Sequence, residues 1–218
     1  MLVYGERRAA GEAEGLLVLH HGRGSDEHDL LAVGELLDPD RRLHVVTPRA
    51  PLQLPGSPGY HWYLVPRVGY PDRATFDAAR ALLGDLHEEL RQRTGISAER
   101  TVLGGFSMGA VMSYAVGLDR GREPVAGVLA FSGFVPEVES WEPDLAGRTA
   151  TRVFVAHGDS DSVIDVDFAR KALATLTGAG LEVEYHESGV GHRIDPAHLP
   201  PARDWIEATL PADRPPGS

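Results

Sequence analysis

A serine set between glycines is the residue of this chain best suited to chemistry. Ser107 is the centre of the pentapeptide Gly105-Phe106-Ser107-Met108-Gly109, a Gly-x-Ser-x-Gly pattern. A hydroxyl is a poor nucleophile unless a base takes its proton and the backbone holds it exposed. A tight strand-to-helix turn gives that exposure, and only small residues tolerate its crowded backbone. The pattern predicts a nucleophilic serine if a strand, a helix, an acid and a base surround it.

The base is expected among the ten histidines of the chain. His192 lies in the glycine-rich segment 189–192, between the last predicted strand and the last predicted helix. His186 ends that strand and His198 falls in that helix, so both are less free to reach across a sheet edge. His157 directly follows another strand and is better explained as a donor that fixes a loop. We therefore expect His192 to be the general base.

Three aspartates crowd the loop after the strand predicted at 152–156, and any of them could orient the imidazole of His192. Each also has a structural explanation. Asp161 could cap the following helix, Asp159 could stabilise the turn, and Asp165 could sit in or beside the helix. The chain order of serine, acid and histidine is that of α/β-hydrolases and of neither serine-protease order. The residues alone leave the choice of acid open.

An acyl-transfer site also needs two donors for the developing oxyanion. One is expected to be the backbone N–H of Met108, directly after the nucleophile. The other should come from the loop after an early strand, where Gly22-Arg23-Gly24 lets the backbone face the site, and we expect the Arg23 N–H. The Arg23 side chain could point to solvent or recognise an anionic substrate.

Apolar runs alternate with helical patterns along the chain, which predicts a mostly parallel sheet with helices on both faces. Leu2-Val3-Tyr4 could add an antiparallel edge strand. Ligands of open α/β sheets bind at the carboxyl ends of the strands, where Ser107 and His192 fall. The strands are predicted at 16–19, 44–47, 101–103, 125–131, 152–156 and 181–186, and the helices at 29–37, 110–118, 166–176 and 196–210, with another between the capping Asp72 and the terminating Gly95.

Two loops rich in aromatic residues are expected to line the substrate pocket. Segment 49–71 is dense in proline, glycine and aromatic residues without periodicity, and such long loops are often functional. With the loop 133–141 it supplies four pocket candidates: Trp62, Tyr63, Phe106 and Phe134. The alternative is that some of them cover the sheet edge, since aromatic side chains dominate cores as well as pockets.

The length and the net charge of the chain limit the classes of protein to which it can belong. The 218 residues suit one domain, which we place at 1–210, with 211–218 as a flexible tail. A formal net charge of −11 without a basic stripe argues against nucleic acid as a partner.

Missing sequence features narrow the expectations further. The chain has no cysteine, no His-x-x-x-His pair and no Gly-x-Gly-x-x-Gly after a strand, so no metal or cofactor is implied. Residues 1–15 lack the apolar core of a signal peptide and no run approaches a membrane span, so we expect a cytoplasmic protein. The oligomeric state, monomer or homodimer, stays open.

Several ordered segments together resemble the phospholipase/carboxylesterase family of α/β-hydrolases, which includes acyl-protein thioesterases and small bacterial esterases. The resemblance implies an α/β-hydrolase fold and assigns the acid to Asp161, while the lack of a long inserted segment predicts a minimal lid. It spans roughly residues 16 to 195 and rests on Leu19-His20-His21-Gly22-Arg23-Gly24 with Asp29-Leu30, Pro48-Arg49-Ala50-Pro51, Trp62, Gly104 to Gly109, Phe131-Ser132-Gly133, His157-Gly158-Asp159-Ser160-Asp161 and Gly191-His192.

The expected function is hydrolysis of small to medium carboxylic esters through an acyl-enzyme on Ser107, Asp161 and His192. Thioesters and lysophospholipids are near variants of the small-molecule ester substrate. A hydrolase-fold protein that binds a ligand without turnover is a different class of function, and perhydrolysis or peptide cleavage are other activities of a reactive serine.

Overall fold

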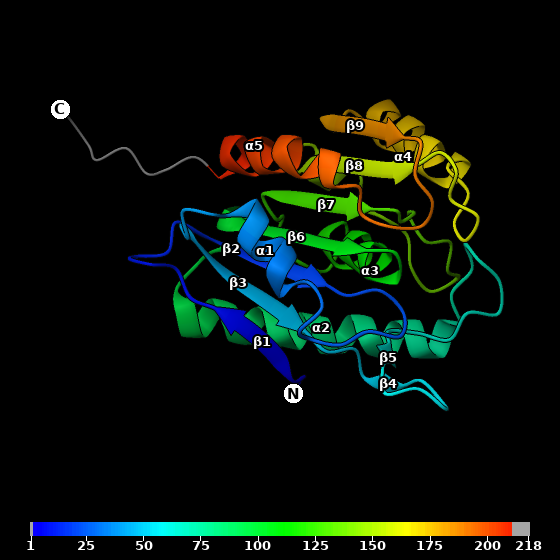
Figure 1. Ribbon diagram of the computed structural model, residues 1–218, viewed down its shortest axis with the longest axis horizontal. Helices are drawn as coiled ribbons and strands as arrows, with labels where there is room; N and C mark the ends of the chain where they lie inside the picture. Colours follow the sequence, from blue (N-terminus) through cyan, green and yellow to red (C-terminus); the bar gives the residue numbers. More distant parts are fainter. Residues whose placement is uncertain (1, 211–218) are drawn as a thin grey trace.

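The computed structural model describes residues 2–210, so the expected tail at 211–218 lies outside the described residues. Within them, a seven-stranded sheet has the order β1-β3-β2-β6-β7-β8-β9 (Figure 1). Every neighbouring pair is parallel except β1 and β3, so the prediction of a mostly parallel sheet is confirmed. The strands are β1 Tyr4–Arg7, β2 Gly15–His20, β3 Leu43–Pro48, β6 Thr101–Phe106, β7 Gly127–Phe131, β8 Arg152–Gly158 and β9 Val183–Ser188.

Helices cover both faces of this sheet and form two separate cores. Alternate residues of a strand point to opposite faces, so Leu16 and Val18 of β2 enter one core while Leu17 and Leu19 enter the other. The first core is closed by α2 Arg73–Thr94, α3 Met108–Gly117 and α4 Asp167–Gly178, and the second by α1 Leu31–Leu37 and α5 Leu199–Thr209. The sheet is thus buried on both faces, as its continuous apolar runs predict.

The longest helix, α2, begins and ends where the sequence predicts. The Asp72 side chain accepts a hydrogen bond from the Thr75 N–H, and Gly95 takes the left-handed conformation at φ 73°. Both devices satisfy backbone groups that lack a partner within the helix.

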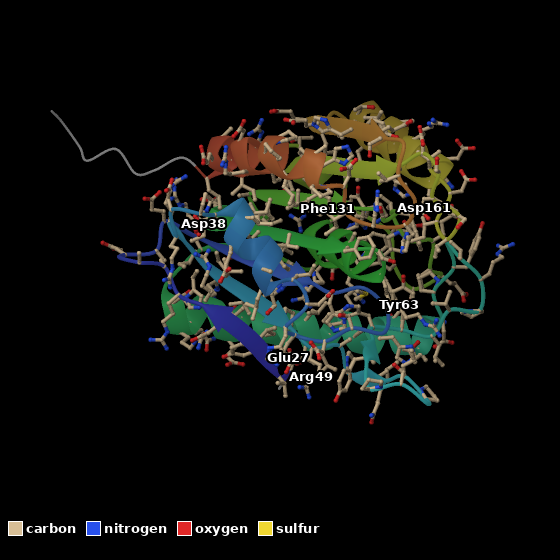
Figure 2. The ribbon with its side chains drawn as sticks, viewed as in Figure 1. Glu27, Asp38, Arg49, Tyr63, Phe131 and Asp161 are labelled. Carbon is tan, nitrogen blue, oxygen red and sulfur yellow. The ribbon has the colours of Figure 1, made fainter. Side chains whose placement is uncertain are left out.

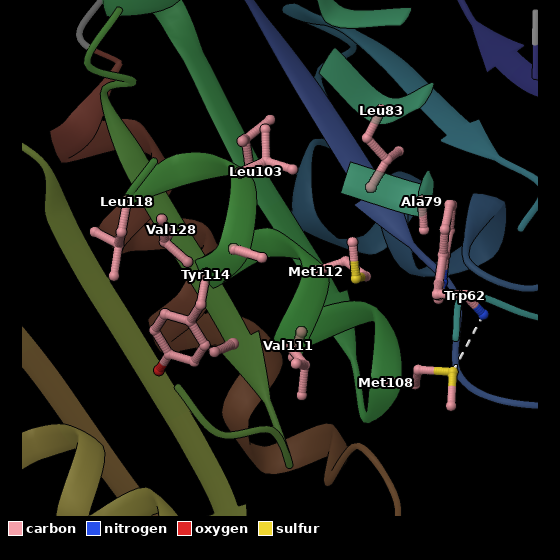
Figure 3. Packing of buried hydrophobic residues seen from close by; sticks show 14 of the residues in the cluster. Trp62, Ala79, Leu83, Leu103, Met108, Val111, Met112, Tyr114, Leu118 and Val128 are labelled. Atoms are coloured by element: carbon pink, nitrogen blue, oxygen red, sulfur yellow. Dashed lines mark hydrogen bonds between the residues drawn. The ribbon is translucent and has the colours of Figure 1, made fainter. Parts of the chain in front are cut away.

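Helix α3 is buried along its whole length. Its Val111, Met112 and Tyr114 pack in the same core as Leu83 of α2 (Figure 3). A Cβ at Gly109 would lie 1.9 Å from the backbone oxygen of His20, so only glycine lets the start of α3 seat against the end of β2. This close seating fixes α3 behind the serine turn.

The structure corrects some element boundaries. The edge strand pairs antiparallel as expected, but it is β1 at 4–7 and not 2–4, and α1 begins at Leu31 and not at residue 29. Segment 49–71, expected without regular structure, contains a short antiparallel pair, β4 Leu52–Gln53 and β5 Tyr60–His61. A single 3-10 turn, Pro196–His198, precedes α5.

Candidate active site

Ser107 occupies a strained turn between β6 and α3. Its φ of 55° and ψ of −120° lie outside the regions that L-residues favour, at an expected cost of about 1–3 kcal/mol. The Ser107 N–H donates to the Phe131 oxygen at 2.9 Å, which ties the turn to the end of β7. A Cβ at Gly105 would lie 2.6 Å from the Gly109 carbonyl carbon and from the His20 oxygen. The crowded turn therefore requires glycine at positions 105 and 109.

Three polar side chains from three loops form a continuous hydrogen-bonded series. Ser107 Oγ lies 2.8 Å from His192 Nε2, and His192 Nδ1 lies 2.7 Å from Asp161 Oδ2. Because a carboxylate oxygen accepts, Nδ1 carries the hydrogen and Nε2 is left to accept from the serine hydroxyl. The three residues follow β6, β8 and β9, at the carboxyl ends of the strands. Asp161 and Tyr63 lie at this same end of the sheet in Figure 2.

Asp161, and neither of its neighbouring aspartates, faces His192. Its Oδ1 accepts the Val163 and Ile164 N–H groups at 2.8 and 2.9 Å, which fixes the carboxylate in a tight turn. Burial alone would raise the pKa of Asp161, but the hydrogen bonds from His192, Ile164 and Val163 outweigh it and hold that pKa below its usual value.

The two other aspartates make local contacts instead. Asp159 is exposed and accepts the Ser160 hydroxyl at 3.0 Å, while exposed Asp165 accepts the Asp167 N–H at 2.9 Å. The α4 helix begins at Asp167, so Asp161 caps a turn before the helix and does not cap the helix itself.

His157 fixes the loop that carries Asp161, as the sequence predicts. Its ring is buried, its Nε2 lies 2.8 Å from the Ile164 oxygen, and the same nitrogen is 3.4 Å from Asp161 Oδ2. The imidazole thus joins both ends of the turn 161–164.

His21 and Trp62 hold the loop after β2 in place, a role that the sequence analysis did not predict. His21 Nε2 accepts the Ala50 N–H at 3.0 Å, so the other ring nitrogen carries the hydrogen and donates to the Gly22 oxygen at 2.7 Å. Burial is the main cause that lowers the pKa of His21, which favours this neutral form. Trp62 Nε1 donates to the His21 oxygen at 2.9 Å. The pair His20-His21 was the feature of the sequence that could have indicated this role.

Both expected oxyanion donors lie on segments that border Ser107. Arg23 follows the fixed His21-Gly22 pair, and Met108 is the first residue of α3, where N–H groups have no partner within the helix. The Trp62 N–H reaches the Met108 sulfur at 3.2 Å (Figure 3). Trp62 therefore contacts both the loop after β2 and the start of α3.

A cleft of about 710 Å³ opens over Ser107 and His192. Tyr63, Phe106 and Phe134 line it, and the Phe106 ring lies 4.9 Å from the His192 ring. The expectation that Trp62 lines the pocket is wrong, because its side chain is fully buried beneath the loop after β2. The remaining lining residues are Arg23, His61, Leu64, Val65, Pro66, Arg67, Val68, Pro71, Met108, Val163 and Ile164.

The described residues 2–210 bear on two other kinds of site. They contain no group of three or more histidine, aspartate or glutamate side chains that could hold a metal ion. No helix in that part of the chain is long and apolar enough to cross a membrane.

The chain is similar to known esterases and thioesterases. The family model described as Phospholipase/Carboxylesterase matches residues 7–210. Esterase YpfH of Escherichia coli (strain K12) is 30% identical over 91% of this chain and 84% of its own, and Acyl-protein thioesterase 1 homolog 1 of Dictyostelium discoideum is 24% identical over 89% and 90%. The crystal structure of esterase PE8 superposes with a TM-score of 0.82 at 32% identity, over 95% of this chain and 99% of that one.

Proposed function

The chain belongs to the phospholipase/carboxylesterase family, and on that premise we propose that it hydrolyses small to medium carboxylic esters through an acyl-enzyme on Ser107. The observation that carries the proposal is the hydrogen-bonded series Ser107–His192–Asp161, with separations of 2.8 and 2.7 Å, at the floor of an open cleft. A nucleophile, a base and an orienting carboxylate in that order are what acyl transfer needs.

In the first half-reaction Ser107 Oγ attacks the ester carbonyl carbon while His192 Nε2 takes the hydroxyl proton. The carbonyl oxygen becomes negative and is stabilised by the N–H groups of Arg23 and Met108. The bond from the carbonyl carbon to the alcohol oxygen then breaks, and His192 gives its proton to the departing oxygen. The products are the alcohol and the acyl ester of Ser107.

The second half-reaction repeats this sequence with water. His192 Nε2 takes a proton from water as the water oxygen bonds to the acyl carbon. The bond to Ser107 Oγ breaks and the serine oxygen regains the proton. The products are the carboxylic acid and the free serine.

Asp161 acts on His192 and not on the substrate. It accepts from Nδ1, so Nε2 is kept as the acceptor that faces Ser107, and its negative charge stabilises the imidazolium formed in each half-reaction. The lowered pKa of Asp161 keeps the carboxylate ionised in this role.

The size and lining of the cleft support small to medium acyl and alcohol groups. Its volume falls in the range of small-molecule sites, and most lining side chains are apolar. The names of the relatives add acyl thioesters, and the family model adds phospholipids, as neighbouring substrate classes. A panel of p-nitrophenyl esters of increasing acyl length, with a palmitoyl thioester and a lysophospholipid, would rank these classes.

The direct test is Ser107→Ala assayed with p-nitrophenyl butyrate. We expect turnover to be lost, because the alanine cannot form the acyl-enzyme, while Ser160→Ala retains it because that exposed hydroxyl donates to exposed Asp159, outside the hydrogen-bonded series. Undiminished hydrolysis by Ser107→Ala would refute the proposal. Tight ester binding by the wild type without any turnover would instead show a binding protein.

A further inference from the structure

Two arginines that line the cleft differ from most other cations of the described residues. Arg7, Arg42, Arg49, Arg80, Arg93, Arg152 and Arg170 each form an ion pair with a carboxylate. Between residues 2 and 210, no ion pair within 4 Å involves Arg23 or Arg67. Paired arginines are thus the rule outside the cleft, in a chain with a net charge of −11.

The cleft itself has a one-sided charge. Its described lining includes two cations, Arg23 and Arg67, and it includes no aspartate or glutamate. The acids nearest in sequence to Arg23 are directed elsewhere: Asp26 and Asp29 line a different cavity, and Glu27 pairs with Arg49. An anion entering the cleft therefore meets positive charge without a competing carboxylate on the walls.

Of the two arginines, Arg23 has fewer neighbouring groups that offset its positive charge. The Arg67 guanidinium stacks on the Tyr70 ring at 3.7 Å and lies close enough to Glu137 to help lower the pKa of that carboxyl, after the larger effect of Lys171. The Arg23 side chain is exposed, and its charge acts on His61, another residue of the cleft wall. Its guanidinium is therefore free to bind a ligand.

The sheet order indicates which part of the substrate Arg23 meets. His192 must protonate the departing alcohol, and it follows β9, whereas Arg23 follows β2. These two strands lie on opposite sides of β6, which carries Ser107. Because the alcohol departs toward His192, the acyl group lies on the side of Ser107 that faces Arg23, beside the carbonyl oxygen that the Arg23 N–H holds.

We propose that the Arg23 side chain binds a carboxylate at the far end of a short acyl group, so that the substrates are monoesters of short dicarboxylic acids. This inference rests on the proposed esterase function and adds its substrate class. Guanidinium and carboxylate can form two parallel hydrogen bonds, which fixes orientation as well as charge. The acyl group is short because Arg23 itself flanks the carbonyl, so its side chain reaches only the near part of the chain.

The test compares two substrates with one leaving group, mono-p-nitrophenyl glutarate and p-nitrophenyl pentanoate, which differ by a carboxylate in place of a methyl. We expect the ratio of their kcat/KM values to favour glutarate in the wild type and to fall about tenfold in Arg23→Gln, mainly through KM. Arg23→Lys should retain part of the ratio. Gln and Lys keep the backbone N–H at position 23, so the ratio isolates the side chain.

A matched control is Arg120→Gln, which removes one positive charge from an exposed side chain outside the cleft lining and should leave the ratio unchanged. An unchanged ratio in Arg23→Gln, with both esters still hydrolysed, would overturn the inference and leave the esterase function standing. A wild-type preference for 4-acetoxybenzoate, whose carboxylate is on the alcohol side, over phenyl acetate without one for glutarate would also overturn it. Failure of the wild type to hydrolyse any of these esters would contradict the proposed function as well.

Discussion

The two carboxylate oxygens of Asp161 have different roles, one in the local turn and one toward His192. Oδ1 accepts two backbone N–H groups of its own turn, and Oδ2 accepts from His192. This division explains how one residue can be buried, ionised and correctly aimed. It also predicts that a small change at Oδ2 will act on catalysis more than on folding.

Asp161→Asn should lower kcat about 10³–10⁴-fold, because an amide N–H facing His192 would favour the wrong imidazole tautomer. The amide oxygen can still accept from Val163 and Ile164, so the thermal midpoint should change little. The matched control is Asp159→Asn, two residues away and exposed, which should stay within about twofold of the wild type. The opposite ranking in a p-nitrophenyl butyrate assay would assign the acid to Asp159.

Residue-level prediction from sequence succeeded where a pattern constrains the backbone and stopped where only side-chain chemistry distinguishes candidates. The glycines around Ser107 predict the turn because no other residue fits there. The three aspartates after β8 are chemically alike, so only the fold could separate them. Aromatic residues are equally suited to a core and a pocket, which is why the sequence could not show that Trp62 is buried in the core while Tyr63 lines the cleft.

At the scale of elements, the loop after β2 depends on partners distant in the chain. His21 bridges this loop to Ala50, and Trp62 bridges it to the start of α3. An oxyanion site must be fixed before the charge develops, since donors that have to reorganise stabilise it less. The segment 49–62 therefore acts as a support for the catalytic loop as well as a wall of the cleft.

Trp62→Phe removes the donor to the His21 oxygen and should lower kcat about tenfold, because the Arg23 N–H loses its fixed position. The unsatisfied carbonyl should also cost about 1–3 kcal/mol of stability. Trp205→Phe is the matched control: this buried residue of α5 contacts Phe154, away from the cleft lining. Both variants should melt earlier, and equal loss of kcat in the two would contradict the supporting role of Trp62.

Element boundaries show the same limit of local patterns. Gly95 and Asp72 set the ends of α2 by local backbone chemistry, and both were predictable. The pairing of β1 at 4–7 is set by its register against β3, and the β4–β5 pair is set by contact between distant halves of one loop. The periodicity of a short segment cannot predict which distant strand that segment will pair with.

At the scale of the whole molecule, the sheet separates two cores, and one of them contains a histidine that the proposed reaction does not use. His20 ends β2, is fully buried, and its Nδ1 lies 2.8 Å from the Ser113 hydroxyl of α3. Because Ser113 donates to the Gly109 oxygen, the His20 ring donates to Ser113. Burial, with smaller effects of His87 and His21, lowers the pKa of His20 well below its usual value.

This burial links stability to pH. Below about pH 6.5 the unfolded chain binds a proton at His20 that the folded chain rejects, so the free energy of unfolding should fall as the pH falls. The contribution reaches about 1.4 kcal/mol per pH unit. His20→Asn keeps a donor for Ser113 but does not titrate, so urea unfolding between about pH 6 and pH 5 should show a shallower dependence. An unchanged dependence would show that His20 does not stay neutral in the fold.

The nucleophile is best identified by the reaction of the protein with a fluorophosphonate, which modifies a serine only when a base activates it. We predict one adduct per chain, located by mass spectrometry on Ser107, with hydrolysis lost in proportion to labelling and neither adduct nor turnover in Ser107→Ala. An adduct on another residue, or full hydrolysis by a chain labelled at Ser107, would contradict the assignment of Ser107 as the nucleophile.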